Sequence, residues 1–408
     1  MKEKQYGLLG KALKHSYSKE IHESFGKYNY ELFQVEPEDL GSFLIKEELA
    51  GLNVTIPYKK EVIKYCETLS EEAVEIGAVN TMVRQQNGAW AGYNTDHAGF
   101  LYLLEQAKIT LKNKKVLIFG SGGTFLTASY VAKKEGASEV VCISRTGESN
   151  YENLHLHKDA QILINTTPVG MFPHIDKEVA SINEFPLCEG VIDVIYNPLR
   201  TRLVLQAKEK GIPAIGGLGM LVKQAVQAYS LFMGEGLPKE TTREILKELY
   251  KQKENIVLTG MPGCGKTAIG KLLAESMQRE FIDTDEMIFK ETGRTAEELI
   301  NTEGEHYFRQ YEKEIVKKVS VQTGIVIATG GGAVLDEENV MALKQNGRVY
   351  FIERDIEKLA VLGRPLSKNI QQLYIERCGI YQETADVKIK NNSEIQQTVQ
   401  YILKEIEK

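Results

Sequence analysis

Apolar residues along this chain gather in short continuous runs, and the stretches between the runs carry glycine turns or apolar residues at helical spacing. Four such runs occupy residues 115–119, 139–143, 161–164 and 190–195. Continuous apolar runs of this length indicate strands that are buried on both faces, as in parallel sheets covered by helices. The pattern therefore predicts an α/β fold with parallel sheets.

A fifth run, at 255–259, leads into a glycine loop at 260–267 and then into a helical pattern at 268–277. The loop reads GMPGCGKT and matches the phosphate-binding pattern G-x-x-x-x-G-K-[ST] at each fixed position. Backbone N–H groups in such a loop converge on phosphate oxygens, and Lys266 and Thr267 would serve the outer phosphates and Mg²⁺. A plain glycine-rich turn is the alternative, but the strand–loop–helix context favours a nucleoside triphosphate site.

Two changes of pattern divide the chain. A polar helix predicted at 239–253 ends in Lys-Gln-Lys-Glu just before the phosphate-loop strand, which indicates a boundary near 250–254. A weaker division falls near 105–113, ahead of the strand that ends in a second glycine turn. We predict three modules, at 1–106, 107–216 and 254–408.

Composition narrows the class of protein. The 408 residues are 42% hydrophobic and 26% charged, which is typical of globular domains. A net charge of −6 without a basic cluster argues against a nucleic-acid partner, and no apolar run is long enough to span a membrane. The N-terminus lacks the apolar core of a signal peptide, and the five cysteines show no metal-ligand spacing. We therefore expect a cytoplasmic protein.

The glycine turn in the middle module is Gly120-Ser-Gly-Gly-Thr124, placed between a predicted strand and a predicted helix. Such a turn suits a dinucleotide pyrophosphate, although a plain βα turn explains it nearly as well. The next strand ends in Ser144-Arg-Thr146, where an NAD site would place an acid for the ribose hydroxyls. An arginine there suits a 2′-phosphate, so this module is predicted to bind NADP.

Five further segments surround this module. They are GLLGKALKHSYSKEIH at 7–22, GLNVTIPYKK at 51–60, IGAVNT at 76–81, GYNTD at 92–96 and GLGMLVKQ at 217–224. Together they resemble the shikimate dehydrogenase family from about residue 5 to residue 250. The resemblance implies a substrate domain at 1–106 that is completed by 217–252, and a Rossmann-like NADP domain between the two parts.

The same resemblance implies roles for individual residues. Lys59 would stabilise the oxyanion that forms from a ring ketone and would pass it a proton, and Asp96 would orient Lys59. The substrate's carboxylate and hydroxyls would be held by Ser16, Ser18, Thr55, Lys59, Asn80, Asp96, Tyr196 and Gln224. NADP would be bound by Gly120, Ser121, Gly122, Gly123, Thr124, Ser144, Arg145, Thr146, Val194 and Gly217. The stretch between Arg145 and Asn165 is shorter than is usual in the family, which predicts an NADP domain trimmed on the adenosine side.

Five motifs downstream of the phosphate loop indicate a second family. They are FIDTD at 281–285, expected to end a strand, EGEHYFR at 303–309, ATGGG at 328–332, GRPL at 363–366 and RCGIY at 377–381. This order resembles the shikimate kinase family over 254–408. The resemblance implies a parallel-sheet kinase domain with a lid, which is shorter than usual in this chain.

Residue roles in the kinase follow from that resemblance. Asp285 would bind ring hydroxyls and accept a proton, while Arg309 and Arg377 would hold the carboxylate, since guanidinium offers a planar two-donor fork. Gly331 and Gly332 would let the backbone approach the ring. Thr267 and Asp283 would serve the metal. ATP would be bound by Gly263, Cys264, Gly265, Lys266, Thr267, Ala268 and the lid residue Arg364, with Lys266 and Arg364 also acting in catalysis.

The two resemblances together imply a bifunctional enzyme. Its first half would reduce 3-dehydroshikimate to shikimate with NADPH, and its second half would phosphorylate shikimate to shikimate 3-phosphate with ATP and Mg²⁺. Three alternatives stay open: a quinate/shikimate dehydrogenase with relaxed cofactor choice, a kinase for another small hydroxylated acid, and an N-terminal half that has become a regulatory module. The sequence leaves the oligomeric state open.

Overall fold

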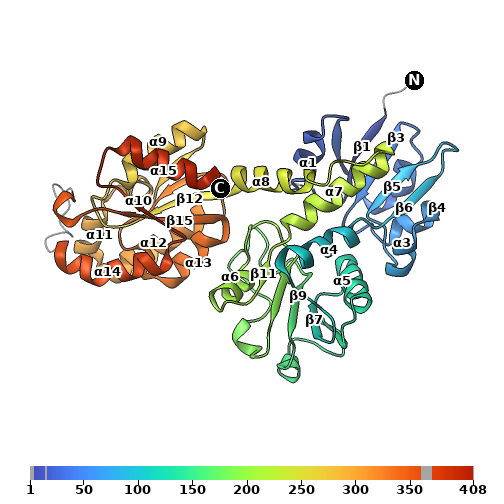
Figure 1. Cartoon of the computed structure of the whole chain (residues 1–408), viewed down its shortest axis with the longest axis horizontal. Coiled ribbons are helices and arrows are strands. Elements are labelled where there is room, and N and C mark those ends of the chain that lie inside the picture. The colour runs from blue at the N-terminus through green and yellow to red at the C-terminus, as the bar shows by residue number, and fades with distance from the viewer. Residues whose placement is uncertain (1–3, 14–15, 360–369, 408) are drawn as a thin grey trace. The chain divides into compact units, whose positions relative to one another are not determined.

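The computed structural model describes residues 4–13, 16–359 and 370–407 of the chain. It contains three sheets with helices packed on them, which confirms the predicted α/β class (Figure 1). Two compact units divide the chain. The first unit comprises Met1–Val169, Glu178–Tyr196 and Gln206–Lys247, and the second comprises Gly170–Lys177, Asn197–Leu205 and Glu248–Lys408. No helix within the described ranges combines the length and the apolar character needed to cross a bilayer.

The first sheet of the first unit has the strand order β2-β1-β3-β5-β6-β4. Strand β1 runs parallel to β2 and β3, whereas β5 is antiparallel to both β3 and β6. The strands are β1 Gln5–Gly10, β2 Tyr30–Gln34, β3 Leu49–Val54, β4 Cys66–Leu69, β5 Thr81–Arg84 and β6 Trp90–Tyr93. Its helices are α1 Ser18–Ser24, α2 Leu40–Leu44, α3 Glu71–Ile76, α4 Asp96–Ala107 and α7 Leu218–Met233.

Helix α7 lies far along the sequence from this sheet but completes its core. Phe232 of α7 packs over Gly51 of β3, where an added Cβ would lie 2.5 Å from the Phe232 ring. Helix α7 also packs on α4, and a Cβ on Gly99 of α4 would lie 2.7 Å from the Met220 carbonyl oxygen. Small residues therefore allow the backbone of α4 and the strand β3 to approach α7.

An aromatic cluster joins α1 to this sheet. The His22 ring stacks on Tyr30 with a centroid distance of 4.0 Å, and its Nδ1 lies 2.7 Å from the Tyr28 hydroxyl. His22 is fully buried, and within the described structure its Nε2 has no hydrogen-bond partner. Burial disfavours the charged imidazolium and lowers the pKa of His22 to about 3.

This depressed pKa predicts an acid-sensitive first unit. Between about pH 6.5 and pH 3 the unfolded chain binds a proton at residue 22 that the folded chain does not, so the free energy of unfolding falls as the pH drops. The expected loss is roughly 2 kcal/mol at pH 5, from about 1.4 kcal/mol per pH unit. His22→Phe should flatten the pH dependence between pH 7 and pH 5. The free energy of unfolding of this unit is measured by urea unfolding, followed by the fluorescence of Trp90, the single tryptophan of the chain.

The control is a change at His155, which is exposed in the same unit. His155→Gln should keep the wild-type pH dependence. An unchanged slope in His22→Phe would show that His22 is not the group responsible.

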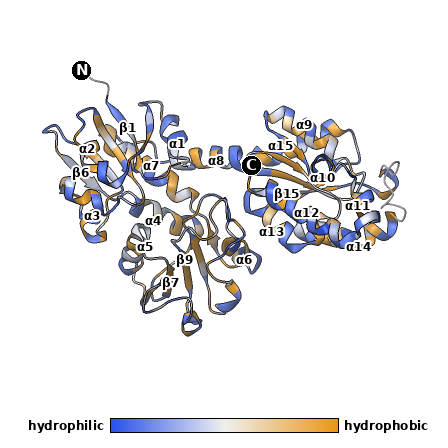
Figure 2. Ribbon diagram, turned by 180° about the vertical axis from the view of Figure 1, so that it is seen from behind, coloured by the Kyte–Doolittle hydropathy of each residue, from blue (hydrophilic) through white to orange (hydrophobic). Residues whose placement is uncertain are grey.

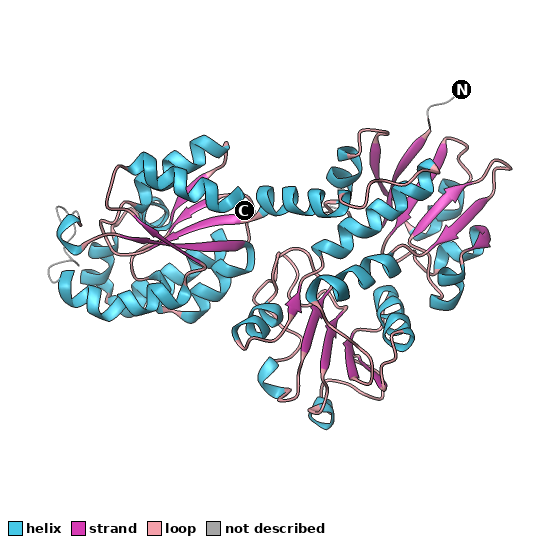
Figure 3. Cartoon of the chain, in the orientation of Figure 1, coloured by secondary structure: helices cyan, strands magenta, loops and turns pink. Residues whose placement is uncertain are grey.

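The second sheet, also in the first unit, is five parallel strands in the order β11-β10-β9-β7-β8. Strands of the chain are magenta and helices cyan in Figure 3. The strands of this sheet are β7 Lys115–Phe119, β8 Glu139–Ile143, β9 Ile162–Asn165, β10 Gly190–Asp193 and β11 Ala214–Ile215, and helix α5 is Gly123–Lys134. Helix α6 Arg202–Glu209 follows β10, and a division between the units falls within it, after Leu205. The predicted run at 190–195 stops as a strand at Asp193, because the Asp193 carboxylate accepts the Ile195 N–H and turns the chain. Between β8 and β9 the chain forms only a short 3₁₀ turn, Leu154–His157.

The third sheet, in the second unit, is again parallel, in the order β13-β14-β12-β15-β16. The strands are β12 Asn255–Thr259, β13 Phe281–Asp283, β14 Val326–Ala328, β15 Gly347–Glu353 and β16 Val387–Lys390. The helices are α9 Lys266–Met277, α10 Thr284–Thr292, α11 Ala296–Glu303, α12 Glu305–Ser320, α13 Glu337–Asn346, α14 Ile370–Thr384 and α15 Ile395–Glu407. Helix α8 Thr241–Lys253 precedes β12, and the division between the units falls within it, after Lys247. Hydrophobic clusters cover both faces of β12, consistent with the apolar strands in Figure 2.

One predicted strand is shorter than expected. The expected strand at 281–285 ends at Asp283, because the Asp283 carboxylate accepts the N–H groups of Asp285 and Glu286 and caps helix α10. Asp285 therefore lies in the first turn of a helix.

Candidate active sites

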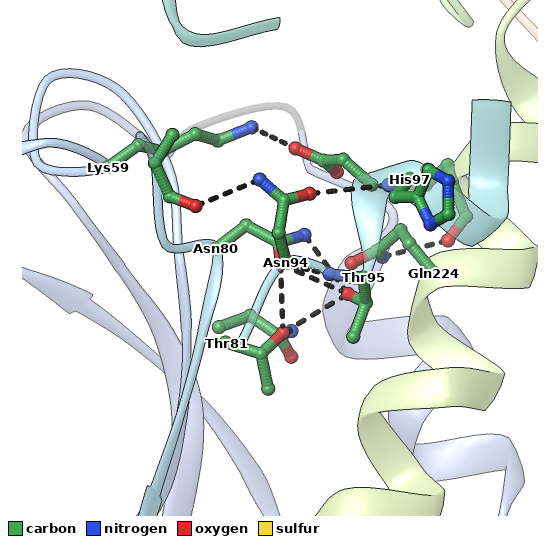
Figure 4. Close-up of polar contacts among 11 residues, drawn as sticks. Lys59, Asn80, Thr81, Asn94, Thr95, His97 and Gln224 are labelled. Atoms are coloured by element: carbon green, nitrogen blue, oxygen red, sulfur yellow. Dashed lines mark hydrogen bonds and ion pairs between the residues drawn. The ribbon is translucent and has the colours of Figure 1, made fainter. Parts of the chain in front are cut away.

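Lys59 and Asp96 form the centre of the first candidate site. Lys59 follows strand β3, Asp96 is the first residue of helix α4, and their Nζ and Oδ2 atoms are 2.5 Å apart (Figure 4). The two side chains are only 13% and 9% exposed, so this ion pair is largely shielded from water. The positive amino end of helix α4 stabilises the negative charge of the Asp96 carboxylate. The carboxylate in turn holds the Lys59 ammonium in one position through a charge-assisted hydrogen bond.

A hydrogen-bond network fixes the turn that leads into α4. The Asn80 Oδ1 accepts the Thr95 N–H at 2.6 Å, and the Asn80 amide donates to the Thr95 hydroxyl at 3.0 Å (Figure 4). Thr81 joins the same hydroxyl at 3.1 Å, and the Asn94 amide donates to the Ala78 carbonyl oxygen at 2.9 Å. Asn80 therefore has a second task besides its predicted one, since it holds the backbone next to Asp96. Thr81, Asn94 and Thr95 stand in the quoted motifs, but the sequence did not assign them this role.

Other predicted substrate residues lie around the same unit in different settings. The Ser16 hydroxyl accepts the Ser18 N–H at 3.2 Å at the start of α1. Burial raises the pKa of Tyr196, and a hydrogen bond with Ser16 partly opposes that effect, so these two side chains meet. Gln224 is buried in α7 and donates to the Leu221 carbonyl oxygen at 2.8 Å, while Thr55 follows β3 and donates its N–H to the Leu9 carbonyl oxygen.

The glycine turn after β7 lies against Lys59. A Cβ on Gly123, the first residue of α5, would lie 3.2 Å from the Lys59 Cδ. Gly120 has a φ of +106° and packs against Thr166, so a side chain there would be strained. Ser121 and Gly122 are exposed, and no acid lies in the first turn of α5, which leaves its amino end suited to a phosphate.

Thr124 is the second residue of α5, and the other predicted NADP residues lie in two places: Ser144 to Thr146 after β8, and Val194 with Gly217. Arg145 and Thr146 follow β8 and are exposed, and within the described part of the chain Arg145 makes no ion pair. Val194 and Gly217 touch each other, since a Cβ on Gly217 would lie 2.0 Å from the Val194 carbonyl oxygen. This contact requires glycine at position 217 and brings the end of β10 beside the start of α7.

The second candidate site is a cavity of about 930 Å³ in the second unit. Eleven of the predicted kinase residues line it: Gly263, Gly265, Lys266, Thr267, Ala268, Asp283, Asp285, Arg309, Gly331, Gly332 and Arg377. Cys264 does not line the cavity, because its side chain is fully buried beneath the loop. Arg364 belongs to 360–369 and lies outside the described residues.

Two side chains fix the conformation of the phosphate loop by hydrogen bonds to its backbone: Lys266 of the loop itself and Asn391, which is distant in sequence. The Lys266 Nζ donates to the carbonyl oxygens of Gly260 and Met261 at 2.8 and 3.2 Å. The Asn391 amide donates to the Cys264 carbonyl oxygen at 2.7 Å. These bonds fix the loop in a ring-like shape, with Gly263 and Gly265 at positive φ.

Two oxygen groups beside the loop fit a magnesium ion. The Thr267 hydroxyl donates to the Asp283 Oδ2 at 2.7 Å, and both side chains line the cavity. Hydroxyl and carboxylate oxygens are the ligands that Mg²⁺ prefers, and it keeps waters and phosphate oxygens for the rest. No group of three or more His, Cys, Asp or Glu side chains suited to a metal was found among the described residues, so phosphate oxygens and water would have to complete the coordination.

Arg309 is held by a buried acid that the sequence analysis missed. Its Nη1 lies 2.8 Å from the Glu312 Oε2, and Glu312 is only 1% exposed. Burial raises the pKa of Glu312, and the neighbouring Arg309 guanidinium opposes that rise. A Cβ on Gly332 would lie 2.2 Å from the Arg309 Nη1, so a side chain there would displace the guanidinium from this position. An acid three residues after Arg309 on one helix was the available signal.

Comparisons with known proteins agree with this arrangement. A shikimate dehydrogenase (NADP(+)) from Clostridium perfringens (strain ATCC 13124) is 34% identical over 268 residues, which cover 60% of this chain and 98% of that protein. The chain belongs to the shikimate dehydrogenase family. The model of the shikimate dehydrogenase substrate binding domain matches residues 8–82, and the shikimate kinase model matches residues 262–407. The chain thus joins a shikimate dehydrogenase to a shikimate kinase domain.

Solved structures extend the likeness of the shikimate dehydrogenase part. A chorismate mutase/shikimate 5-dehydrogenase fusion protein from Clostridium acetobutylicum has a TM-score of 0.57 and 32% identity, covering 61% of this chain and 98% of that chain. A shikimate dehydrogenase in complex with NADP⁺ has a TM-score of 0.55 and 31% identity, covering 61% and 96%. In both comparisons, nearly the full length of the known structure aligns with about three fifths of this chain.

Proposed function

We propose that this chain catalyses two consecutive steps of the shikimate pathway: reduction of 3-dehydroshikimate to shikimate, and phosphorylation of shikimate to shikimate 3-phosphate. The observation that carries the proposal is that one chain holds the shielded Lys59–Asp96 pair beside a dinucleotide turn and, in its other unit, a phosphate-loop cavity with two arginines. The product of the first site is the substrate of the second.

In the dehydrogenase, Lys59 is the catalytic residue. NADPH, when bound, supplies a hydride to the ring carbonyl carbon. The Lys59 ammonium stabilises the charge that develops on the carbonyl oxygen and gives it a proton, and Asp96 keeps Lys59 oriented and binds a substrate hydroxyl. The carboxylate of the substrate is assigned to Ser16 and Ser18, with Tyr196 next to Ser16. Asn80, Thr55 and Gln224 complete the substrate site.

In the kinase, the cavity residues divide between substrate and nucleotide. Arg309 and Arg377 bind the carboxylate, and Glu312 keeps the Arg309 fork in one orientation. Asp285 accepts the proton of the attacking hydroxyl. The loop N–H groups and Lys266 would bind the nucleotide phosphates, and Thr267 and Asp283 would hold Mg²⁺. The lid residue Arg364 remains the proposed partner of the transferring phosphoryl group.

NADP is the proposed dinucleotide because Arg145 is exposed after β8 and, in the described ranges, has no acid paired with it. The intact Lys59–Asp96 pair favours catalysis over a regulatory module, because mere ligand binding does not require a shielded proton donor.

Two assays on the intact chain test the proposal. Shikimate with NADP⁺ should raise the absorbance at 340 nm, at least about tenfold more efficiently than with NAD⁺, because a guanidinium–phosphate contact is worth on the order of 1.5–3 kcal/mol. Arg145→Ala should remove most of that preference. Shikimate with MgATP should release ADP. Failure of dinucleotide reduction alone would favour the regulatory interpretation, and failure of ADP release would overturn the kinase assignment.

A further inference from the structure

Arg354 lines the nucleotide cavity and has no assigned role. It is the first residue after strand β15, and its side chain belongs to the wall of the 930 Å³ cavity together with the phosphate loop. Its Nε is buried, and no hydrogen-bond acceptor in the described structure contacts it.

The position of Arg354 is tied to the phosphate loop by the sheet. Strands β12 and β15 are parallel neighbours, and Thr259, the last residue before the loop, pairs with Phe351. The loop's first glycine, Gly260, lies against β15, since a Cβ there would be 2.6 Å from the Ile352 carbonyl oxygen. Because parallel strands end at the same edge of a sheet, Arg354 leaves β15 on the side where the loop leaves β12.

The acids next to Arg354 in the sequence are engaged elsewhere. The Glu353 carboxylate lies 3.0 Å from the Lys388 Nζ. The Asp355 carboxylate lies 3.5 Å from the Lys358 Nζ and accepts the Asn392 amide at 2.8 Å. Arg354 itself has no ion pair in the part of the chain that the structure describes. A guanidinium that lines an anion-binding cavity without a carboxylate partner leaves its planar donors to a ligand.

We propose that Arg354 is a nucleotide-binding residue of the kinase site, which donates to phosphate oxygens of the bound nucleotide. The proposal rests on the proposed kinase function. Shikimate is the less suitable ligand, because its carboxylate is assigned to Arg309 and Arg377, whereas Arg354 adjoins the phosphate loop. Arg354 therefore adds a positive charge and a two-donor fork to a loop whose own lysine is a point charge.

Binding of MgADP to the intact chain, measured by titration calorimetry, tests the proposal. Arg354→Ala should raise the Kd of MgADP and the KM of MgATP about tenfold or more, because a charge-assisted hydrogen bond is lost. The KM of shikimate should stay within about twofold of the wild-type value, and Arg354→Lys should fall between wild type and alanine.

Arg348→Ala is the matched control, because Arg348 stands at the other end of β15, outside the cavity, and donates to the Glu405 carbonyl oxygen. It should keep the wild-type Kd. A wild-type Kd in a folded Arg354→Ala chain, or a change confined to the KM of shikimate, would overturn the proposal for Arg354 while leaving the kinase assignment intact. A wild-type chain that binds no MgADP would overturn both.

Discussion

Lys266→Ala is expected to lower the rate of ADP release with shikimate by about 10³-fold, since a preorganised cation at the transferring phosphates typically contributes an effect of this order. The Lys266 Nζ is held by the Gly260 and Met261 carbonyl oxygens, so the ammonium is already placed before the nucleotide binds. A kinetic assay of ADP release measures the loss. The reduction of NADP⁺ by shikimate should continue at the wild-type rate, because Lys59 and Asp96 belong to the other compact unit.

Lys271→Ala is the control for this variant. Lys271 lies on the same helix, is exposed, and pairs with Glu286 at 3.3 Å. Exposed pairs of this kind contribute at most about 1 kcal/mol, so the control should retain both activities. If Lys266→Ala abolished both activities together, the two sites could not be independent.

Lys59→Ala is expected to reduce kcat for shikimate oxidation by about 10³-fold, within the 10²–10⁴ range of general acid–base catalysis. The change removes the group that exchanges a proton with the substrate oxygen, and it also leaves the 9% exposed Asp96 without its cation. Absorbance at 340 nm measures the effect. Phosphorylation of shikimate should be unaffected.

The neighbouring Lys60 provides the control, because it is exposed while Lys59 is not. Lys60→Ala should leave kcat unchanged. Unfolding followed by Trp90 fluorescence distinguishes lost chemistry from a lost fold in Lys59→Ala, since Trp90 lies in the same unit. A Lys59→Ala chain that is folded and fully active would rule out Lys59 as the proton donor.

The parts of the fold that are local in sequence were predictable. The phosphate loop is eight consecutive residues, and the strands with continuous apolar runs follow from burial on both faces. The end of β13 was not predicted, because Asp283 serves both as a helix cap and as a partner of Thr267. Local sequence preferences do not show whether Asp283 is the last residue of a strand or the cap of the next helix, because it is both.

The missed site residues depend on contacts that are distant in sequence or on the position of a helix face. Thr95 meets Asn80 across a hairpin, and Glu312 is important only because α12 turns it toward the interior beside Arg309. The role proposed for Arg354 depends on the pairing of β12 with β15, which the sequence does not reveal. In the sequence Arg354 lies between Glu353 and Asp355, which suggests an arginine paired with an acid. Motif spacing indicates which residues belong to a site, whereas contacts between distant parts of the chain decide which of them hold the others in position.

The return of α7 to the first sheet has a consequence for synthesis on the ribosome. Tyr6 and Gly51 emerge early, but Phe232, which covers them, is made after the whole nucleotide-binding sheet, whose last strand ends at Ile215. The first sheet therefore has an uncovered aromatic face while residues 94–232 are synthesised, whereas the second sheet can assemble from its own complete set of strands. Of the two sheets of the first unit, the one encoded first therefore completes its core after the nucleotide-binding sheet.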